Sequence, residues 1–195
     1  MLIKDSIEGQ NINLIKFDNS HSKDLFENAS NDPAIWNHLS IAIITESDFE
    51  KYLNLVNENI GYGRQFTFSI FYKMINRFIG STSILNIDEK NKKVEIGWTW
   101  INSIYWGSKI NMECKYLLVD YLFTKLDIQR IELRTRESNI RSQKAIEKIG
   151  ATKEAVIRLD RINKDGSFRN TILYSLVRPE WKELSHKIKA VLYNL

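Results

Sequence analysis

The sequence has little of three residue types that mark specialised classes of protein. Of its 195 residues, one is cysteine, two are proline and eight are glycine. The single thiol, Cys114, excludes an internal disulfide and a zinc site built from several cysteines, and we expect it to lie inert in the core. The low proline and glycine content excludes collagen-like and low-complexity chains.

Long apolar runs and dense blocks of charge are missing as well. No stretch approaches the roughly 18 apolar residues of a membrane span, and the first residues lack the apolar segment of a signal peptide. We therefore expect no membrane association, and the lack of paired cysteines favours the reducing cytoplasm. The three histidines are scattered and predict no metal site.

The charge balance is mildly basic, with a net charge of +4. This is compatible with an anionic ligand but also with an ordinary surface. The basic residues gather only in a loose cluster, which we interpret as solvated surface: Arg130, Arg134, Arg136, Arg141 and Lys144. Because no basic stripe or tail is present, nucleic-acid binding is disfavoured, and it remains only as an RNA-binding alternative suggested by the high isoelectric point.

The composition, 43% hydrophobic and 11% aromatic, predicts one folded domain over residues 1–195. Runs of β-branched and aromatic residues predict seven strands, at 12–16, 66–72, 78–85, 93–101, 129–135, 153–162 and 168–177. Helical spacing predicts helices near 20–30, 45–61, 110–122, 139–149 and 180–193, the last within a C-terminal helical extension over 179–195.

The order of these elements predicts a mixed α/β (α+β) sheet. Short turns between strands 66–72, 78–85 and 93–101 favour an antiparallel meander. The long helix between strands 93–101 and 129–135 predicts a right-handed parallel crossover. We therefore expect a mostly antiparallel seven-stranded sheet with a central parallel pair between its fourth and fifth strands, and helices on both faces.

The first informative stretch runs from a strand end into the long helix, over residues 94–111. Free N–H groups at the helix start and the positive end of its dipole favour an anion. Lys109 adds positive charge there, and Gly107 allows a close backbone approach to a pyrophosphate. The alternative is an ordinary strand-to-helix turn, since no established nucleotide-binding motif is present.

The second informative stretch, residues 134–151, is a strand followed by a helix. Asn139 stands at the helix start, Ser142 one turn later and Gly150 at the helix end. The alternative to a functional role is structural, because Asn139 can act as a helix cap and a small Ser142 lets the helix pack close to the sheet.

Together these stretches resemble the GNAT superfamily of acetyl-CoA-dependent N-acetyltransferases, most closely its Rim-type branch, the ribosomal-protein N-terminal acetyltransferases. The resemblance extends over about residues 8–182. The motifs that carry it, in chain order, are Glu95–Trp98, Trp106-Gly107, Asn139 with Ser142, Lys144-Ala145 with Gly150, Glu154 with Arg158, Asp165-Gly166, Tyr174-Ser175-Leu176 and Pro179-Glu180-Trp181.

The resemblance implies the GNAT fold, with acetyl-CoA as co-substrate and no metal. The implied cofactor-binding residues are Trp100, Ile101, Trp106, Gly107, Ser108, Lys109, Ile110, Asn111, Asn139, Ser142 and Lys144. The chain departs from the family's phosphate loop, because Lys109 and Asn111 stand where small residues are usual. The tyrosine that many members use as general acid falls at Ile146, so the resemblance gives Ser142 the role of protonating the leaving thiolate.

The remaining catalytic and acceptor residues are less defined. Glu95 is our candidate base, with a strand residue facing solvent or a cation as the alternative. The carboxylate proposed as base in Rim-type relatives falls near Asp160 or Arg161. Trp36 and Trp98 are candidates for lining an acceptor cleft, and core packing is their alternative role.

The expected reaction is acetyl transfer to a primary amine. Deprotonating a lysine-like amine at neutral pH costs about 4.6 kcal/mol, against about 1 kcal/mol for an α-amine, which favours a peptide N-terminus. A small amine is kept as a second acceptor class. The alternative function is a non-catalytic acyl-CoA-binding or protein-interaction domain of the same fold. No surface pattern fixes the oligomeric state, and a homodimer is kept open beside a monomer.

Overall fold

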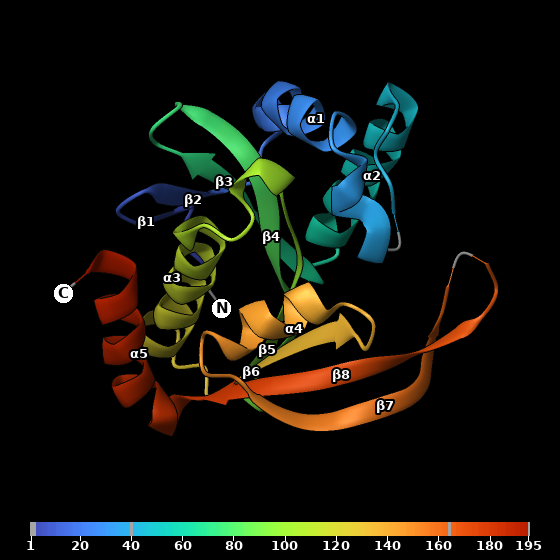
Figure 1. Ribbon diagram of the computed structural model, residues 1–195. Helices are drawn as coiled ribbons and strands as arrows, with labels where there is room; N and C mark the ends of the chain where they lie inside the picture. The colour runs from blue at the N-terminus through green and yellow to red at the C-terminus, as the bar shows by residue number, and fades with distance from the viewer. Residues whose placement is uncertain (1–2, 40, 164, 195) are drawn as a thin grey trace.

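The structure, a computed structural model, describes residues 3–39, 41–163 and 165–194. Its centre is one sheet in the order β1-β2-β3-β4-β5-β6-β8-β7 (Figure 1). The strands are β1 Ser6–Glu8, β2 Ile12–Lys16, β3 Gln65–Tyr72, β4 Arg77–Asp88, β5 Lys93–Ile101, β6 Arg130–Arg136, β7 Thr152–Ile162 and β8 Phe168–Val177.

All seven predicted strands are present, but the predicted count of seven is wrong, because the described chain forms eight. The additional strand, β1, is three residues long and pairs antiparallel with β2 at the edge of the sheet. Its residues alternate as polar, apolar and polar, but three residues are too few for this alternation to stand out as a strand signal.

The predicted parallel pair is confirmed as β5 and β6, and every other neighbouring pair is antiparallel. The helix between them, α3, makes the crossover. The helices are α1 Ser22–Ser30, α2 Glu46–Gly61, α3 Lys109–Lys125, α4 Ile140–Glu147 and α5 Arg178–Tyr193, with short 3-10 turns at Asn19–His21, Pro33–His38 and Ser103–Tyr105.

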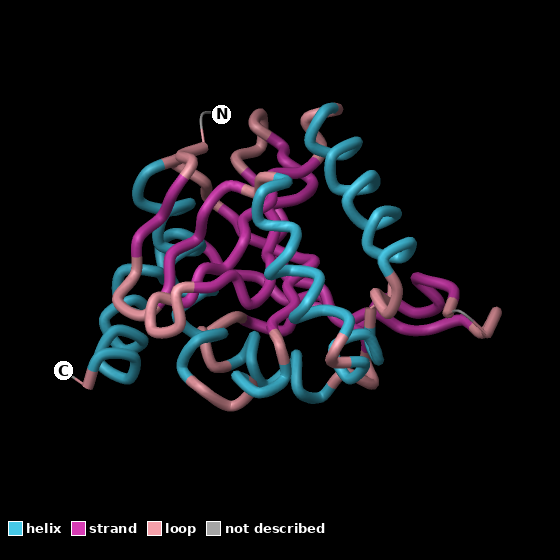
Figure 2. The backbone as a smooth tube through the Cα atoms, turned by 90° about the horizontal axis from the view of Figure 1, so that it is seen from above, coloured by secondary structure: helices cyan, strands magenta, loops and turns pink. Residues whose placement is uncertain are grey.

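Helices cover both sides of the sheet, as predicted (Figure 2). The larger core packs α3, α4 and α5 on one face, where Cys114 is 1% exposed and Leu118 is fully buried. A second core packs α1, α2 and the turn at 33–38 on the other face, around Trp36 and Trp100. No helix within the described ranges is long and apolar enough to cross a membrane.

The second face is covered only in part. Helices α1 and α2 lie over β3 and β4, where their contacts with the sheet are made. Over β6, β7 and β8 the same face carries charged and polar side chains instead. The β7–β8 hairpin extends beyond the body of the molecule (Figure 1). This leaves a polar half-face beside the second core.

The sheet also splits in its middle. β5 pairs with β6 only from Lys93 to Ile96, and after that point β6 pairs with β8 alone. One extra residue bulges from β5 against β4 between Gly97 and Trp100, where Trp98 has a left-handed φ of 51°. A bulge bends a strand and increases its twist, so the end of β5 turns away from β6.

Candidate active site

A cleft of about 470 Å³ occupies this split in the sheet. Its walls come from the ends of β5 and β6, the beginnings of α3 and α4, the turn at 33–38 and the β7–β8 hairpin. It therefore reaches both faces of the sheet. We call its side toward α3 and α4 the helix side, and its side toward β7 and β8 the hairpin side.

The helix side begins where α3 starts. Ser108 caps α3, its hydroxyl accepting from the Ile110 N–H at 3.3 Å. Gly107 has a φ of 77°, and no heavy atom lies within 4 Å of the position that its Cβ would take. The backbone there faces open space, as a strand-to-helix loop must if it is to hold a phosphate.

The start of α4 completes the helix side. Asn139 caps this helix by accepting from the Ser142 N–H at 3.1 Å, so its structural role is present. The hydroxyl of Ser142 makes no hydrogen bond within the described part of the chain, and Ser142 lines the cleft. Arg141 stacks on Trp106, with its guanidinium carbon 3.2 Å from the ring centroid.

These features fit acetyl-CoA. Two helix N-termini and the side chains of Lys144 and Lys148 supply positive potential for its phosphates. The β5 backbone after Ile96, which β6 does not pair, offers peptide groups to an extended chain such as pantetheine. Most predicted cofactor residues line the cleft: Trp100, Ile101, Trp106, Gly107, Ser108, Asn111, Asn139, Ser142 and Lys144.

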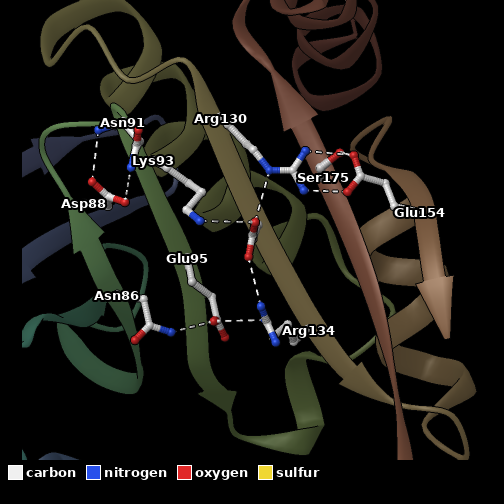
Figure 3. A network of polar contacts seen from close by, with 10 residues as sticks. Asn86, Asp88, Asn91, Lys93, Glu95, Arg130, Arg134, Glu154 and Ser175 are labelled. Carbon is white, nitrogen blue, oxygen red and sulfur yellow. Dashed lines mark hydrogen bonds and ion pairs between the residues drawn. The ribbon is translucent and has the colours of Figure 1, made fainter. Parts of the chain in front are cut away.

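The hairpin side holds Glu95, the candidate base. Its side chain is 13% exposed, accepts from Asn86 at 2.9 Å and lies 3.4 Å from the Arg134 guanidinium (Figure 3). Burial raises the pKa of Glu95 above its ordinary value, against the opposing effects of Asn86 and Arg134. Glu95 borders the cleft, which agrees with a general base, and it contacts Arg134, which agrees with a strand residue paired with a cation. Both interpretations therefore remain supported.

Glu132 lies opposite Glu95 in the parallel register and behaves differently. Burial acts to raise its pKa too, but hydrogen bonds from Arg130 and Arg134 outweigh that effect, and the pKa is lowered. The Glu132 carboxylate lies within 4.0 Å of the charged nitrogens of Lys93, Arg130 and Arg134, three residues that Figure 3 labels. Two neighbouring carboxylates with pKa values moved in opposite directions suit different roles, and Glu95 is the one suited to accept a proton.

Three predicted site residues lie away from the cleft. The Lys109 ammonium donates to the Leu192 carbonyl at 3.0 Å and to Asn194 Oδ1 at 2.7 Å, so it ties α3 to the end of α5. Ile110 is 6% exposed in the larger core. Trp36 is 4% exposed in the second core, where its indole N–H donates to the Ala29 carbonyl. By contrast, Trp98 lines the cleft.

Sequence reasoning missed most of the hairpin side. From the sequence, Arg136 is interpreted as solvated surface and Arg169 and Thr171 are given no role, yet all three line the cleft. Asp160 and Arg161, at the expected position of the relatives' base, line it as well. One signal was available: charged residues alternate along β6, from Arg130 to Arg136, in a strand that lies inside the sheet. Such alternation indicates a strand with one face on the core and one face on a polar site.

Comparison with known proteins decides the family. A profile of the acetyltransferase (GNAT) domain matches residues 11–152, which is more than half of the chain. The chain belongs to the GNAT acetyltransferase family. It is an acetyl-CoA-dependent N-acetyltransferase, and the eight-stranded sheet with its split between β5 and β6 is its GNAT fold.

Individual proteins similar to this chain include two named as N-acetyltransferases and one solved structure that shares its fold. The p20 protein of Bacillus licheniformis, named an uncharacterised N-acetyltransferase, is 28% identical over 77% of this chain and 84% of p20. YdaF of Bacillus subtilis (strain 168), to which a ribosomal N-acetyltransferase activity is provisionally ascribed, is 31% identical over 53% of this chain and 55% of YdaF. RimJ of Mycobacterium smegmatis, solved with CoA-disulfide, shares the fold at a TM-score of 0.78 and 18% identity, over 92% of this chain and 88% of RimJ.

The described residues of this GNAT protein hold no group of three or more His, Cys, Asp or Glu side chains that is arranged to bind a metal ion. Cys114, the single thiol, is buried on α3, and burial raises its pKa to about 12. A thiol held in this form is a weak nucleophile.

Proposed function

We propose that this GNAT protein transfers the acetyl group of acetyl-CoA to a primary α-amine, at a peptide N-terminus or on a small molecule. One observation carries the proposal: the cleft passes through the sheet and joins two helix starts on one side to a partly buried carboxylate on the other. Cofactor and acceptor thus approach the same point from opposite faces.

On the helix side, Gly107, Ser108 and Asn111 hold the pyrophosphate at the start of α3, with Lys144 contributing positive charge from α4. The unpaired end of β5 binds the pantetheine chain through its peptide groups. Backbone N–H groups of this segment polarise the thioester carbonyl, and such donors are most effective when they are fixed before the reaction. The bulge at Trp98 fixes them by setting the path of the strand.

The reaction forms a C–N bond and breaks the C–S bond of the thioester. The neutral amine attacks the carbonyl carbon, and Glu95 takes one proton from the amine, directly or through water. The Ser142 hydroxyl, which no other residue of the described chain engages, donates to the leaving thiolate and passes it a proton that water returns to Ser142. A weak donor is sufficient there, because a free thiol has a pKa of about 8.5.

The carboxylate favours an α-amine over a lysine side chain. At pH 7 the neutral form costs about 1 kcal/mol for an α-amine and about 4.6 kcal/mol for a lysine-like amine. Among the groups of the hairpin side, Arg134, Arg136, Arg161 and Arg169 are cations, which do not accept protons. Glu95, Asp160 and His38 are the groups of the cleft that can accept a proton, and the less costly amine is the better substrate for them.

A turnover assay with paired acceptors tests the proposal. We expect thiol release from acetyl-CoA with a dipeptide amide that has a free N-terminus, and far less with N-acetyl-lysine amide at pH 7. Raising the pH toward 10 reduces this difference, because it removes the protonation cost of the lysine. An equal rate for both amines at pH 7 contradicts the α-amine preference, and no thiol release with any amine contradicts the acetyl transfer.

A further inference from the structure

The hairpin side carries more positive charge than the acetyl transfer requires. Arg136, Arg161 and Arg169 come from three adjacent strands, β6, β7 and β8, and all line the cleft. Arg136 pairs with Thr171, two residues from Arg169 on β8, and Arg169 pairs with Arg161. Cross-strand partners share a face of the sheet, so these side chains gather on one patch.

Several polar atoms of this patch have no hydrogen-bond partner in the described chain. They are the Nε atoms of Arg136 and Arg169, the Thr171 hydroxyl and Asp160 Oδ2, and each is buried. Asp160 Oδ2 has an ion-pair contact only, with Arg161 Nε at 3.5 Å. Buried donors and acceptors are almost always paired in folded proteins, so a group of four beside one cleft indicates a ligand that pairs them.

Two of the arginines, Arg136 and Arg169, make no ion pair within the described part of the chain, whereas Arg161 contacts Asp160. Burial lowers the pKa of Arg169, and the nearby guanidinium groups of Arg136 and Arg161 lower it further, against the opposing effect of Asp160. Arg136 donates to Asn163, a neutral side chain, and Arg169 makes no hydrogen bond among the described residues. Holding like charges together without a partner disfavours the folded protein, and an anion from outside reverses that effect.

The cofactor is not that anion. Its phosphates belong at the starts of α3 and α4, whereas Arg136, Arg169 and Thr171 lie on the sheet face opposite these helices. Glu95 lies on this face too. Its partner in the parallel register is Glu132, which stands four residues before Arg136 on β6 and therefore points to the same face. The patch therefore meets the acceptor.

Resting on the acetyl transfer proposed above, we propose that the acceptor is an anionic α-amine, with a carboxylate that binds Arg136, Arg169 and Thr171. Guanidinium groups bind carboxylates through paired donors, and Thr171 adds a hydroxyl donor. Asp160 offers an acceptor oxygen for the ammonium form of the same molecule. The carboxylate comes either from a free amino acid or from an acidic side chain beside a peptide N-terminus.

Two matched pairs of acceptors separate charge from size. Alanine is compared with alaninamide, and the peptide Ala-Glu-Ala-amide with Ala-Gln-Ala-amide, in the thiol-release assay. We expect the carboxylate member of one pair to have a kcat/KM at least about tenfold higher, the size of a charge-assisted hydrogen bond. The pair in which kcat/KM differs identifies the source of the carboxylate, a free amino acid or an acidic side chain. Equal values within both pairs overturn the inference.

Variants of the patch link the preference to Arg169. Arg169→Gln removes the preference without changing the Kd for acetyl-CoA, and Arg169→Lys, which keeps charge but not the guanidinium, retains part of it. The matched control is Arg158→Gln, an exposed arginine of the same hairpin that does not line the cleft. A preference that survives Arg169→Gln contradicts the inference.

A binding measurement keeps this inference separate from the acetyl transfer. Calorimetry with the products N-acetylalanine and N-acetyl-Ala-Glu-Ala-amide, against their neutral counterparts, requires no turnover and uses the protein saturated with CoA. Tighter binding of a carboxylate member supports the anion patch even if no amine is acetylated. Equal binding within both product pairs overturns it even if acetylation is observed.

Discussion

The two sides of the cleft are built in different ways. On the helix side, helix caps and backbone groups predominate, and the cap hydrogen bonds of Ser108 and Asn139 are complete before any ligand arrives. On the hairpin side, charged side chains predominate, and Arg136, Arg169 and Asp160 keep buried atoms without hydrogen-bond partners. The helix caps thus form their hydrogen bonds without a ligand, whereas the buried polar atoms of the hairpin side need a ligand to pair with.

This difference follows from what each side has to recognise. Acetyl-CoA is one molecule with one set of phosphates, so helix starts and a single glycine are sufficient for it. An acceptor must be distinguished from many other amines, which requires side chains placed for its particular charges. Substitutions on the two sides should therefore alter different kinetic parameters.

The largest effect is expected on the hairpin side, from Glu95→Gln. The amide cannot take a proton, so we expect kcat/KM to fall about 100-fold, in the range of a lost general base, while the Kd for acetyl-CoA stays unchanged. Because burial raises the pKa of Glu95, the wild-type rate should rise with pH through that raised value, and the variant should lose this part of the profile. An unchanged profile would remove Glu95 from proton transfer.

The same substitution should not weaken the fold. A carboxyl with a raised pKa binds its proton more tightly when folded, so its contribution to stability declines as pH rises from its ordinary value through the raised one. Above the raised pKa the contribution is lost, and the comparison is made at such a pH. Glu95→Gln should therefore unfold at the same urea concentration as the wild type, or at a higher one.

The helix side is disturbed most by Gly107→Val. A β-branched residue at a φ of 77° is strained by roughly 1–3 kcal/mol, so the loop must change shape. We expect acetyl-CoA to bind about tenfold more weakly by calorimetry, with the acceptor KM unchanged. Gly107→Asn is the matched control, because asparagine tolerates this conformation. Wild-type affinity in the valine variant would mean that this loop does not touch the cofactor.

The helix side was also the more predictable one. Gly107, Asn139 and Ser142 stand in short contiguous motifs, and such motifs are visible in the sequence because one loop or one helix turn carries them. Lys109 was an exception, since its partner at the end of α5 is 83 residues away in the chain. A contact between distant segments leaves no local pattern.

The hairpin side shows why the rest was missed. Arg136 and Arg169 come from two strands, and only the register of β6 with β8 brings them together. Within the fold, the seven longer strands and the parallel pair were predicted because periodicity and connection length are local signals. Strand β1 and the β5 bulge were not, because three edge residues and one inserted residue leave no period to detect.

A smaller effect is expected from Ser142→Ala. If this hydroxyl protonates the thiolate, kcat should fall about threefold to tenfold, since a thiol with a pKa near 8.5 leaves with little assistance. The Kd for acetyl-CoA should change little, because Asn139 binds the Ser142 backbone N–H rather than its side chain. Ser138→Ala, in the exposed turn just before α4, serves as the control. An unchanged kcat would leave Ser142 a packing role only.

The smallest effect concerns stability on the hairpin side, in Arg169→Gln. Removing a partly buried cation that repels Arg136 and Arg161 should leave the Tm unchanged or raise it by up to about 3 °C, in the absence of ligand. Calorimetric scans of the wild type and the variant measure this. A clear fall in Tm would show that Arg169 supports the fold rather than an acceptor.

The split sheet has a mechanical consequence. The β1–β5 half of the sheet is joined to the β6–β8 half by the pairing of β5 with β6. This pairing consists of four residue pairs, from Lys93 with Arg130 to Ile96 with Leu133. Because so few strand pairs join the halves, we expect the molecule that first fills the gap to set the width left for the second. Binding should then be ordered, with acetyl-CoA bracing the two halves and slowing amide hydrogen exchange in both. The cofactor would serve this enzyme as scaffold as well as reagent.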